Sequence, residues 1–196
     1  MDPSLEIELK IQCDAKNFVN ALNSEMGSVQ INDMSQWLSK IECWKKQYPI
    51  CAPCYYKEKE INPYVLVKAL SQECEAEETI ITDTGCAVAW MLQAFEFKKN
   101  QRLLHDWNNT AMGWAIPAAI GAAFTQKGKR VICVSGDGSF QMNIQELSTI
   151  IHHNLPIKIF ILNNHGYSMI QQTQAQWLDS RYDASSVQGG LGFPDF

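Results

Sequence analysis

The most constraining feature of the sequence is a regular alternation of short apolar runs with helix-length segments, which begins near Asn62. The apolar runs predict buried strands at 79–82, 102–105, 130–135 and 157–162. The segments around them predict helices over 62–74, 86–95, 113–126 and 143–153. Such an alternation is typical of parallel sheets with crossover helices on their faces. The sequence therefore predicts an α/β fold with a doubly wound parallel sheet.

The residues before this alternation follow a less regular pattern. Alternating apolar residues over 5–11 predict a strand, and Asp14 is placed to cap a helix over 15–22. The polar stretch that holds Trp37 and Trp44 predicts a further helix. This part of the chain resembles the end of one domain and a connection to the next.

We therefore divide the chain into three parts. Residues 1–27 are expected to be the tail of a preceding domain, and residues 28–60 a linker that contains a helix. Residues 61–196 are expected to form the α/β domain. Because the chain reaches Phe196 without a closing element, we expect this domain to be truncated at its C-terminus.

The charge and hydropathy of the chain argue against several classes of function. The formal net charge is −5 and no run of Lys or Arg is present, so nucleic-acid binding is not expected. The longest apolar stretch, at 115–124, contains Pro117 and is too short to span a membrane. The acidic start lacks the basic region of a signal peptide, so we expect a cytoplasmic protein.

The seven cysteines form an odd number without the spacing of a disulfide framework. Cys51 and Cys54 have the spacing of a redox motif, but neither a clear strand nor a clear helix flanks them. A second such pair, or a pair of histidines, would be needed to complete a zinc site. We favour reduced thiols over a redox or metal function for these residues.

The chemistry of the chain is concentrated after the predicted strand 130–135, in the run Gly136-Asp137-Gly138-Ser139. Two glycines beyond a strand end indicate a sharp turn whose backbone lies open to a ligand. Free N–H groups of such a turn, and of the helix that follows, bind anions. Asp137 would repel an anion, unless a divalent cation lies between the carboxylate and a diphosphate.

A second ligand for this cation is expected after the next strand. Asn164 lies 27 residues beyond Asp137, which is the length of one strand–helix–strand crossover, and both follow strand ends. The backbone carbonyl of Gly166 is a candidate third ligand. Asp-Gly and Asn-Asn are each common in turns, so the signal is their pairing at crossover spacing.

The run from GDGS to Asn163-Asn164 resembles the thiamine diphosphate motif of pyruvate-type decarboxylases, acetolactate synthases and their relatives. The stretches 140–150, 154–158 and 163–167 are similar to the acetolactate-synthase-like branch in particular. The resemblance covers about residues 60–196, and residues 1–27 are similar to the end of that family's central domain. It implies a thiamine diphosphate-binding fold that carries the diphosphate-binding half of an active site.

The resemblance also implies a role for individual residues. Mg²⁺ would be bound by Asp137, Asn164 and the Gly166 carbonyl. Backbone N–H groups would bind the diphosphate, and the residues around it would be Thr84, Gly85, Cys86, Gly136, Gly138 and Ser139. Met112 would support the bent cofactor, the Thr110 carbonyl would accept a hydrogen bond from its 4′-amino group, and Met169 would lie beside the thiazolium. For both methionines the alternative is plain core packing.

The activity implied is decarboxylation of a 2-oxo acid such as pyruvate, with transfer of the two-carbon unit to an acceptor carbonyl. In this family the catalytic glutamate lies on a separate pyrimidine-binding domain, usually of another subunit, so no catalytic residue is expected in this chain. A homo-oligomer, dimer or tetramer, is expected of the full-length protein, which could also bind FAD outside this segment. Pyruvate decarboxylases have a glutamate at the position of Ile170, which favours carboligation over aldehyde release.

Three alternatives differ from this interpretation. The run 164–174 also resembles carboligases of bacterial surface-sugar pathways, which act on a nucleotide-linked ketosugar. A fragment of this kind could bind the cofactor without catalysis and act in assembly. A dehalogenase-type phosphatase is disfavoured because Asp83 lacks the second acid of Asp-x-Asp, and a dinucleotide site because Gln141 replaces the third glycine.

Overall fold

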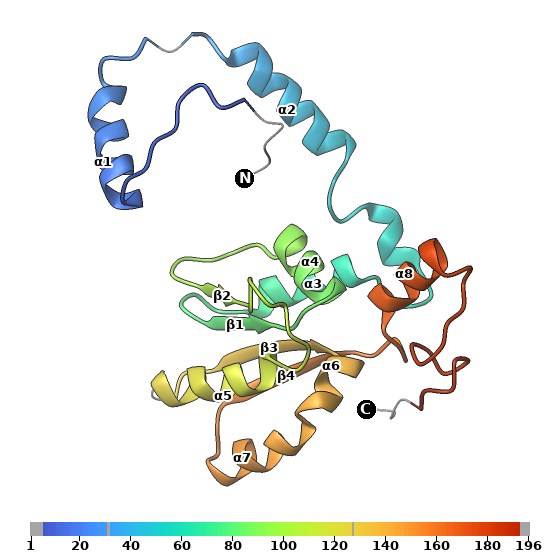
Figure 1. Ribbon diagram of the computed structural model, residues 1–196. Coiled ribbons are helices and arrows are strands. Elements are labelled where there is room, and N and C mark those ends of the chain that lie inside the picture. The colour runs from blue at the N-terminus through green and yellow to red at the C-terminus, as the bar shows by residue number, and fades with distance from the viewer. Residues whose placement is uncertain (1–5, 31, 127, 193–196) are drawn as a thin grey trace. The chain divides into compact units, whose positions relative to one another are not determined.

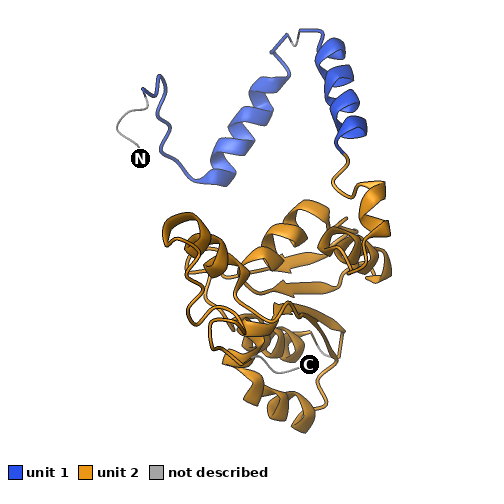
Figure 2. Cartoon of the chain, turned by 90° about the vertical axis from the view of Figure 1, so that its right-hand side faces the viewer, with its two compact units in different colours: residues 1–48 blue, residues 49–196 orange. Residues whose placement is uncertain are grey.

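The computed structural model describes residues 6–30, 32–126 and 128–192. The chain divides into two compact units, Met1–Tyr48 and Pro49–Phe196, which Figure 2 shows in different colours. Among the described residues, no helix has the length and apolar character that crossing a bilayer requires.

The described residues of the first unit contain two helices, α1 (Ala15–Met26) and α2 (Ser35–Gln47). The predicted cap at Asp14 is confirmed, because its carboxylate accepts hydrogen bonds from two backbone N–H groups of the first turn. The predicted strand over 5–11 is wrong for the described residues 6–11, which are irregular and exposed. A strand needs a neighbour to pair its backbone groups, and these residues have none within the described part of the chain.

The second unit is the α/β domain, and its elements follow the predicted alternation closely. A 3₁₀ turn η1 (Pro53–Lys57) and helix α3 (Pro63–Glu73) lead into the sheet. The strands are β1 (Thr79–Thr82), β2 (Arg102–Leu104), β3 (Val131–Gly136) and β4 (Ile157–Leu162). The remaining helical elements are α4 (Cys86–Ala94), α5 (Ala115–Thr125), α6 (Asp137–Met142), η2 (Ile144–Glu146), α7 (Leu147–His152) and α8 (Ser168–Trp177).

The four strands form one parallel sheet in the order β2-β1-β3-β4. In β1, Ile80 packs toward one face and Ile81 toward the other, as the alternation of side chains along a strand requires. Ile80 joins a core with α3 and α4, whereas Ile81 joins a core with α5 (Figure 1). Helices therefore cover both faces of the sheet, and the predicted doubly wound α/β fold is confirmed.

The predicted helix over 143–153 is interrupted at its start. Helical structure already begins at Asp137, and it breaks at Asn143, whose φ is −136°. The side-chain amide of Asn143 donates to the Gly113 carbonyl oxygen at 2.7 Å. This contact with a loop 30 residues away holds the Asn143 side chain, so α6, η2 and α7 do not form one continuous helix.

Candidate functional site

The candidate site lies where β1, β3 and β4 end, at the carboxyl edge of the sheet. Because the strands are parallel, the segments that follow them meet at this one edge (Figure 1). They are the loop after Thr82, the start of α6 after Gly136, and the loop between Leu162 and Ser168. Nine of the twelve predicted site residues lie in these segments or in the first turns of the helices that follow them. The exceptions are Gly136, which is the last residue of β3, and Thr110 and Met112, which lie on the loop before α5.

Asp137 is the buried centre of this edge. One carboxylate oxygen, Oδ1, accepts from the N–H of Gly138 at 2.8 Å. The other, Oδ2, accepts from the N–H of Gly166 at 3.1 Å and so reaches across to the loop after β4. The structure thus joins the two predicted motifs through one carboxylate.

The Asn164 side chain lies beside the Asp137 carboxylate and the Gly166 carbonyl. We call these three groups the corner. One atom of the Asn164 side-chain amide lies 3.1 Å from Asp137 Oδ1 and 2.9 Å from the Gly166 carbonyl oxygen, and the amide also contacts Ser168 Oγ. If this atom is nitrogen, it donates to both oxygens; if it is oxygen, three oxygens converge on one point. The second orientation is favourable only with a cation among them, and oxygen is the ligand that Mg²⁺ prefers.

The rest of this corner is poor in protein ligands. Within residues 6–30, 32–126 and 128–192, no group of three or more His, Cys, Asp and Glu side chains is arranged to bind a metal. A cation at Asp137 would therefore need further oxygens from a bound anion or water, as Mg²⁺ sites with phosphate ligands do.

The two glycines of the GDGS run differ in how much space surrounds them. Gly136 is the last residue of β3 with φ −76°, and a Cβ there would meet no heavy atom within 4 Å. Gly138 lies inside α6, where a Cβ would be 2.0 Å from Cε1 of Tyr167. The strand passes directly into the helix at these residues, and of the two glycines only Gly138 is required by close packing, because it admits the Tyr167 ring.

The loop after β1 approaches Met169 of α8. Gly85 has a φ of +80°, which favours glycine, and a Cβ there would lie 3.8 Å from Met169 Cγ. Cys86 begins α4 directly after it, so the first N–H groups of this nine-residue helix belong to the same edge. Two predicted cofactor residues separated by 84 positions are thereby brought together.

Asp83 is a buried residue of this edge that the sequence reasoning missed as a structural centre. Its Oδ1 accepts from the N–H groups of Thr84 at 2.9 Å and Gly113 at 3.1 Å. Its Oδ2 accepts from the N–H of Ala115 and from Ser135 Oγ, both at 3.2 Å. An acid directly after a buried strand is the only local signal of this role.

Two predicted diphosphate donors are engaged within the chain. The N–H of Thr84 donates to Asp83, and the N–H of Gly138 donates to Asp137. Both N–H groups therefore have carboxylate partners within the chain, and their donation to a diphosphate stays a prediction. Gly85, Cys86 and Ser139 stay candidates for backbone donation.

The loop that contains Thr110 and Met112 is exposed, and hydrogen bonds at Gly113 hold its C-terminal end. Thr110 has a φ of +49°, and its N–H donates to the Asp106 carbonyl at 2.8 Å. Met112 is 37% exposed and Met169 is 50% exposed, so plain core packing is wrong for both methionines. Gly113, held by Asp83 and Asn143, anchors the loop at the candidate site.

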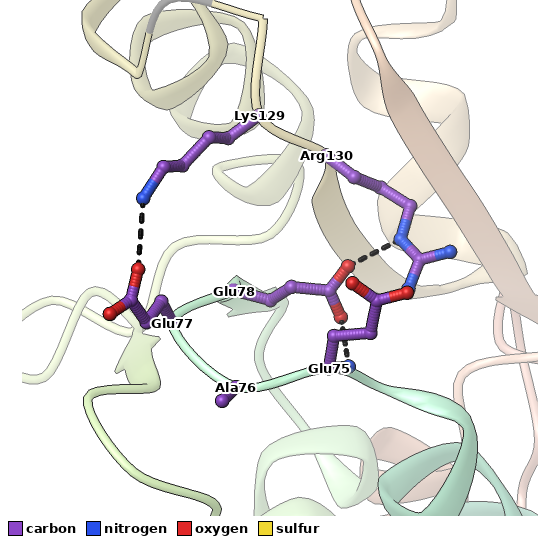
Figure 3. A pocket seen from close by; sticks show the side chains of 6 residues that line it. All are labelled: Glu75, Ala76, Glu77, Glu78, Lys129 and Arg130. Carbon is purple, nitrogen blue, oxygen red and sulfur yellow. Dashed lines mark hydrogen bonds and ion pairs between the residues drawn. The ribbon is translucent and has the colours of Figure 1, made fainter.

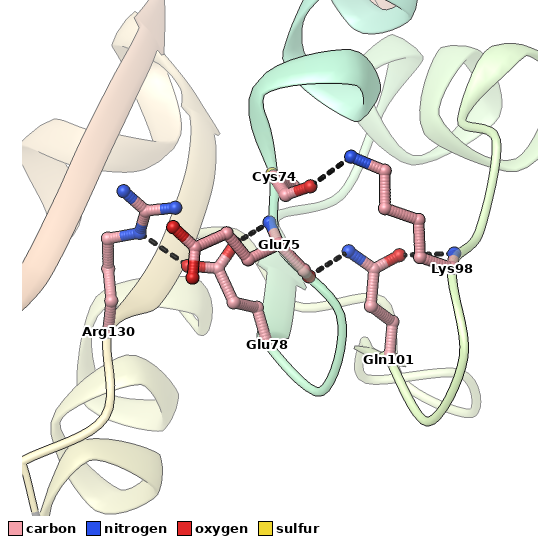
Figure 4. Close-up of polar contacts among 6 residues, drawn as sticks. All are labelled: Cys74, Glu75, Glu78, Lys98, Gln101 and Arg130. Carbon is pink, nitrogen blue, oxygen red and sulfur yellow. Dashed lines mark hydrogen bonds and ion pairs between the residues drawn. The ribbon is translucent and has the colours of Figure 1, made fainter.

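A pocket of about 370 Å³ lies at the opposite, amino edge of the sheet. Its walls are the residues drawn in Figure 3: Glu75, Ala76, Glu77, Glu78, Lys129 and Arg130. Arg130 pairs with Glu78, and Lys129 pairs with Glu77 at 3.2 Å. Lys98 Nζ donates to the Cys74 carbonyl next to this cluster (Figure 4). Both basic side chains of this pocket therefore have a carboxylate partner in its wall.

The fold and the carboxyl edge together define a ligand-binding α/β domain with an oxygen-rich corner and helix N-termini. Residues 83–196 match the family described as thiamine pyrophosphate enzyme, C-terminal TPP binding domain. This match covers more than half of the chain, and the chain belongs to that family.

Relatives of the chain are acetolactate synthases. The chain is 34% identical to the acetolactate synthase large subunit of Cyanidium caldarium over 194 residues, which are 99% of this chain and 32% of that protein. It is 38% identical to the large subunit of Pyropia yezoensis over 82% of this chain and 26% of the relative. The chloroplastic acetolactate synthase 2 of Zea mays is 33% identical over 90% of this chain and 27% of the relative.

The predicted resemblance to the acetolactate-synthase-like branch is confirmed by these matches. The chain spans about a third or less of the length of these relatives. It therefore corresponds to a TPP-binding domain of acetolactate-synthase-like enzymes.

Proposed function

We propose that this chain is the diphosphate- and magnesium-binding module of an enzyme that decarboxylates a 2-oxo acid, such as pyruvate, and transfers the two-carbon unit to an acceptor carbonyl. The observation that carries the proposal is the corner formed by Asp137, Asn164 and the Gly166 carbonyl. Its donor set fits Mg²⁺, because it supplies hard oxygen ligands and leaves the remaining positions to phosphate and water.

The diphosphate would lie between this corner and the loop after β1. Gly85 and Cys86 lie at the N-terminus of α4, and Ser139 lies in the first turn of α6. Their backbone N–H groups could donate to the diphosphate, because the helix dipole favours negative charge at a helix N-terminus. Thr84 would contribute through its hydroxyl, since its N–H is engaged. The absence of a side chain at Gly138 lets α6 approach the loop after β4.

The two exposed methionines would contact the apolar part of the cofactor. Met169 lies against Gly85, beside the proposed diphosphate donors, which suits a residue next to the thiazolium. Met112 and the Thr110 carbonyl lie on the loop anchored by Gly113. Thiamine diphosphate, when bound, supplies the nucleophilic carbon and the electron sink that decarboxylation requires.

The chain's own residues would bind and orient the cofactor rather than move protons at its pyrimidine ring. That role belongs, in our proposal, to a glutamate of a separate pyrimidine-binding domain in a homo-oligomer. Ile170 follows Met169 on α8, is half exposed and has no titratable group, which favours carboligation over protonation and aldehyde release. A cytoplasmic location also stays a prediction.

Removing the charge of Asp137 tests the cofactor proposal directly. We expect Asp137→Asn to abolish Mg²⁺-dependent binding of thiamine diphosphate in calorimetric titrations, because the amide lacks the only negative charge that a protein side chain brings to the proposed site. The matched control is Asp179→Asn, an exposed charge removal outside the site. Equal affinity of the wild type and Asp137→Asn contradicts the proposed metal site.

A second experiment separates an enzyme module from a cofactor-binding fragment without catalysis. Carbon dioxide release from pyruvate is measured with the chain alone and with an added pyrimidine-binding domain from a relative. Release that depends on the added domain supports the enzyme proposal. Binding of the cofactor without any release in either mixture supports an assembly role instead.

A further inference from the structure

The loop from Asn164 to Tyr167 is held from two sides. On one side the Gly166 N–H donates to Asp137. On the other side the Tyr167 N–H donates to the Ser185 carbonyl oxygen at 2.9 Å, and Gly166 forms an isolated antiparallel bridge with Ser186. A segment near the end of the described chain, 182–191, which we call the strap, therefore packs on the loop that carries two of the proposed metal ligands.

A buried polar pair anchors the strap to α8. Ser185 is fully buried, and its hydroxyl donates to Gln174 Oε1. Gln174 is only 9% exposed, and its Nε2 donates to the Asp183 carbonyl oxygen at 3.0 Å. Buried polar groups are costly without hydrogen-bond partners. Each member of the pair therefore needs the other, and together they fix the strap against the helix.

The strap is in direct contact with Gly166. A Cβ at this residue would lie 2.9 Å from the Ser185 carbonyl oxygen and 2.4 Å from Gln171 Nε2. Gln171 also donates to that same carbonyl at 2.7 Å, one helical turn before Gln174. The two glutamines and Ser185 thus surround the residue whose own carbonyl oxygen lies 2.9 Å from the Asn164 amide.

We propose that Gln174 and Ser185 are a positioning pair, which sets the Gly166 carbonyl through the strap and thereby determines the affinity of the corner for Mg²⁺. The inference rests on the proposed function of that corner. A loosened strap frees the Gly166 backbone, and residues that orient metal ligands typically change metal affinity by about 10- to 100-fold when they are replaced.

The test is a titration of Mg²⁺ into the chain with saturating thiamine diphosphate. We expect Gln174→Leu to weaken Mg²⁺ affinity by about tenfold or more, and Ser185→Ala to weaken it in the same direction by less. Gln172→Leu is the matched control, because Gln172 lies on the same helix and is exposed. Its Mg²⁺ affinity should equal that of the wild type.

The slowing of hydrogen exchange at the Tyr167 amide by Mg²⁺, measured within each variant, gives a readout that a purely structural role would not move. In the wild type, Mg²⁺ with the cofactor should slow exchange at Tyr167, whereas in Ser185→Ala the protection should be smaller at equal cation saturation. A structural role would lower the thermal midpoint and leave Mg²⁺ affinity and this protection unchanged.

The outcomes separate the two proposals. If Asp137→Asn loses Mg²⁺ affinity but folded Gln174→Leu retains it, the positioning pair is refuted and the proposed function stands. If the wild type does not bind Mg²⁺ with the cofactor, both fail. If Gln174→Leu does not fold, Ser185→Ala decides, and wild-type affinity in that variant refutes the positioning pair.

Discussion

At the scale of single residues, buried carboxylates organise the candidate site. Asp83 gathers donors from the loop after β1, the start of α5 and the end of β3. Asp137 does the same for α6 and the loop after β4. Carboxylates without hydrogen-bond partners are costly to bury, so each of these two side chains depends on its set of donors.

How far the site could be predicted from the sequence depends on the range of the contacts. Asp137, Asn164 and Gly166 could be predicted, because strand ends and crossover spacing place them at one edge. The roles of Asp83, Gln174 and Ser185 could not, since their partners lie in other elements and no local pattern marks them. The broken helix at Asn143 has the same cause.

Gly138 and Gly136 offer a matched pair of substitutions. We expect Gly138→Ala to lower the free energy of unfolding by about 1–3 kcal/mol, because the added methyl group overlaps the Tyr167 ring. Gly136→Ala should change it by less than about 0.5 kcal/mol, since the new methyl group meets no atom within 4 Å. Urea unfolding measures both, and equal effects would show that the Tyr167 contact is unimportant.

Because the Cys133 thiol is buried, we expect the protein to lose folding stability at alkaline pH. Burial is the first cause that raises its pKa from 9.0 to about 12, and the charge of Asp83 adds to it. Between these values the unfolded thiol loses its proton while the folded thiol keeps it. The unfolding free energy should fall in that window by up to about 1.4 kcal/mol per pH unit.

The control for this effect is Cys133→Val, which has no ionisable group in either state. Urea unfolding between pH 9 and 11 should show a shallower decline in this variant than in the wild type. An identical slope would assign the alkaline loss to other groups.

At the scale of elements, the strands and helices of the α/β unit were predicted well because their apolar periodicity matches their burial. The segment 5–11 has the same periodicity as a strand, and its described residues form none, since alternation shows which side chains could be buried but supplies no pairing partner. The helix predicted over 143–153 was broken at its start, where the Asn143 side chain forms a distant hydrogen bond.

β1 is one of the two interior strands of the sheet, and all four of its residues are buried. We expect Ile80→Ala to lower the free energy of unfolding by about 2–5 kcal/mol, because Ile80 is fully buried between the sheet and α3 and α4. Ile151→Ala is the control, since Ile151 of α7 is largely exposed. Similar losses for the two variants, in chemical unfolding, would contradict this account of the core.

At the scale of the whole molecule, the two units differ in how they bury apolar surface. Both hydrophobic cores consist of residues of the second unit, whereas α1 and α2 bury none of their residues. Phe18, Leu22 and Met26 recur at helical spacing along α1 and are exposed. An amphipathic helix of this kind suits packing against another domain, as we propose for the tail of a preceding domain at 1–27.

Residues 49–196 alone should therefore fold as stably as the whole chain. We expect the same urea midpoint, within error, for this segment and for the full sequence, because the deletion removes no buried residue of either core. A midpoint that falls clearly on deletion would show that the first unit contributes to the stability of the α/β domain.

The contact between Gly138 and the Tyr167 ring has a thermodynamic consequence for ligands at this edge. It joins α6, which would carry the cation ligand Asp137 and the anion donor Ser139, to the loop after β4, which would carry Asn164 and Gly166, so a shift of one segment displaces the other. Whichever ligand arrives first would order both segments and lower the entropic cost for the second. Linkage then requires the mutual enhancement to be equal in both directions, so that cation and anion load as one cooperative unit.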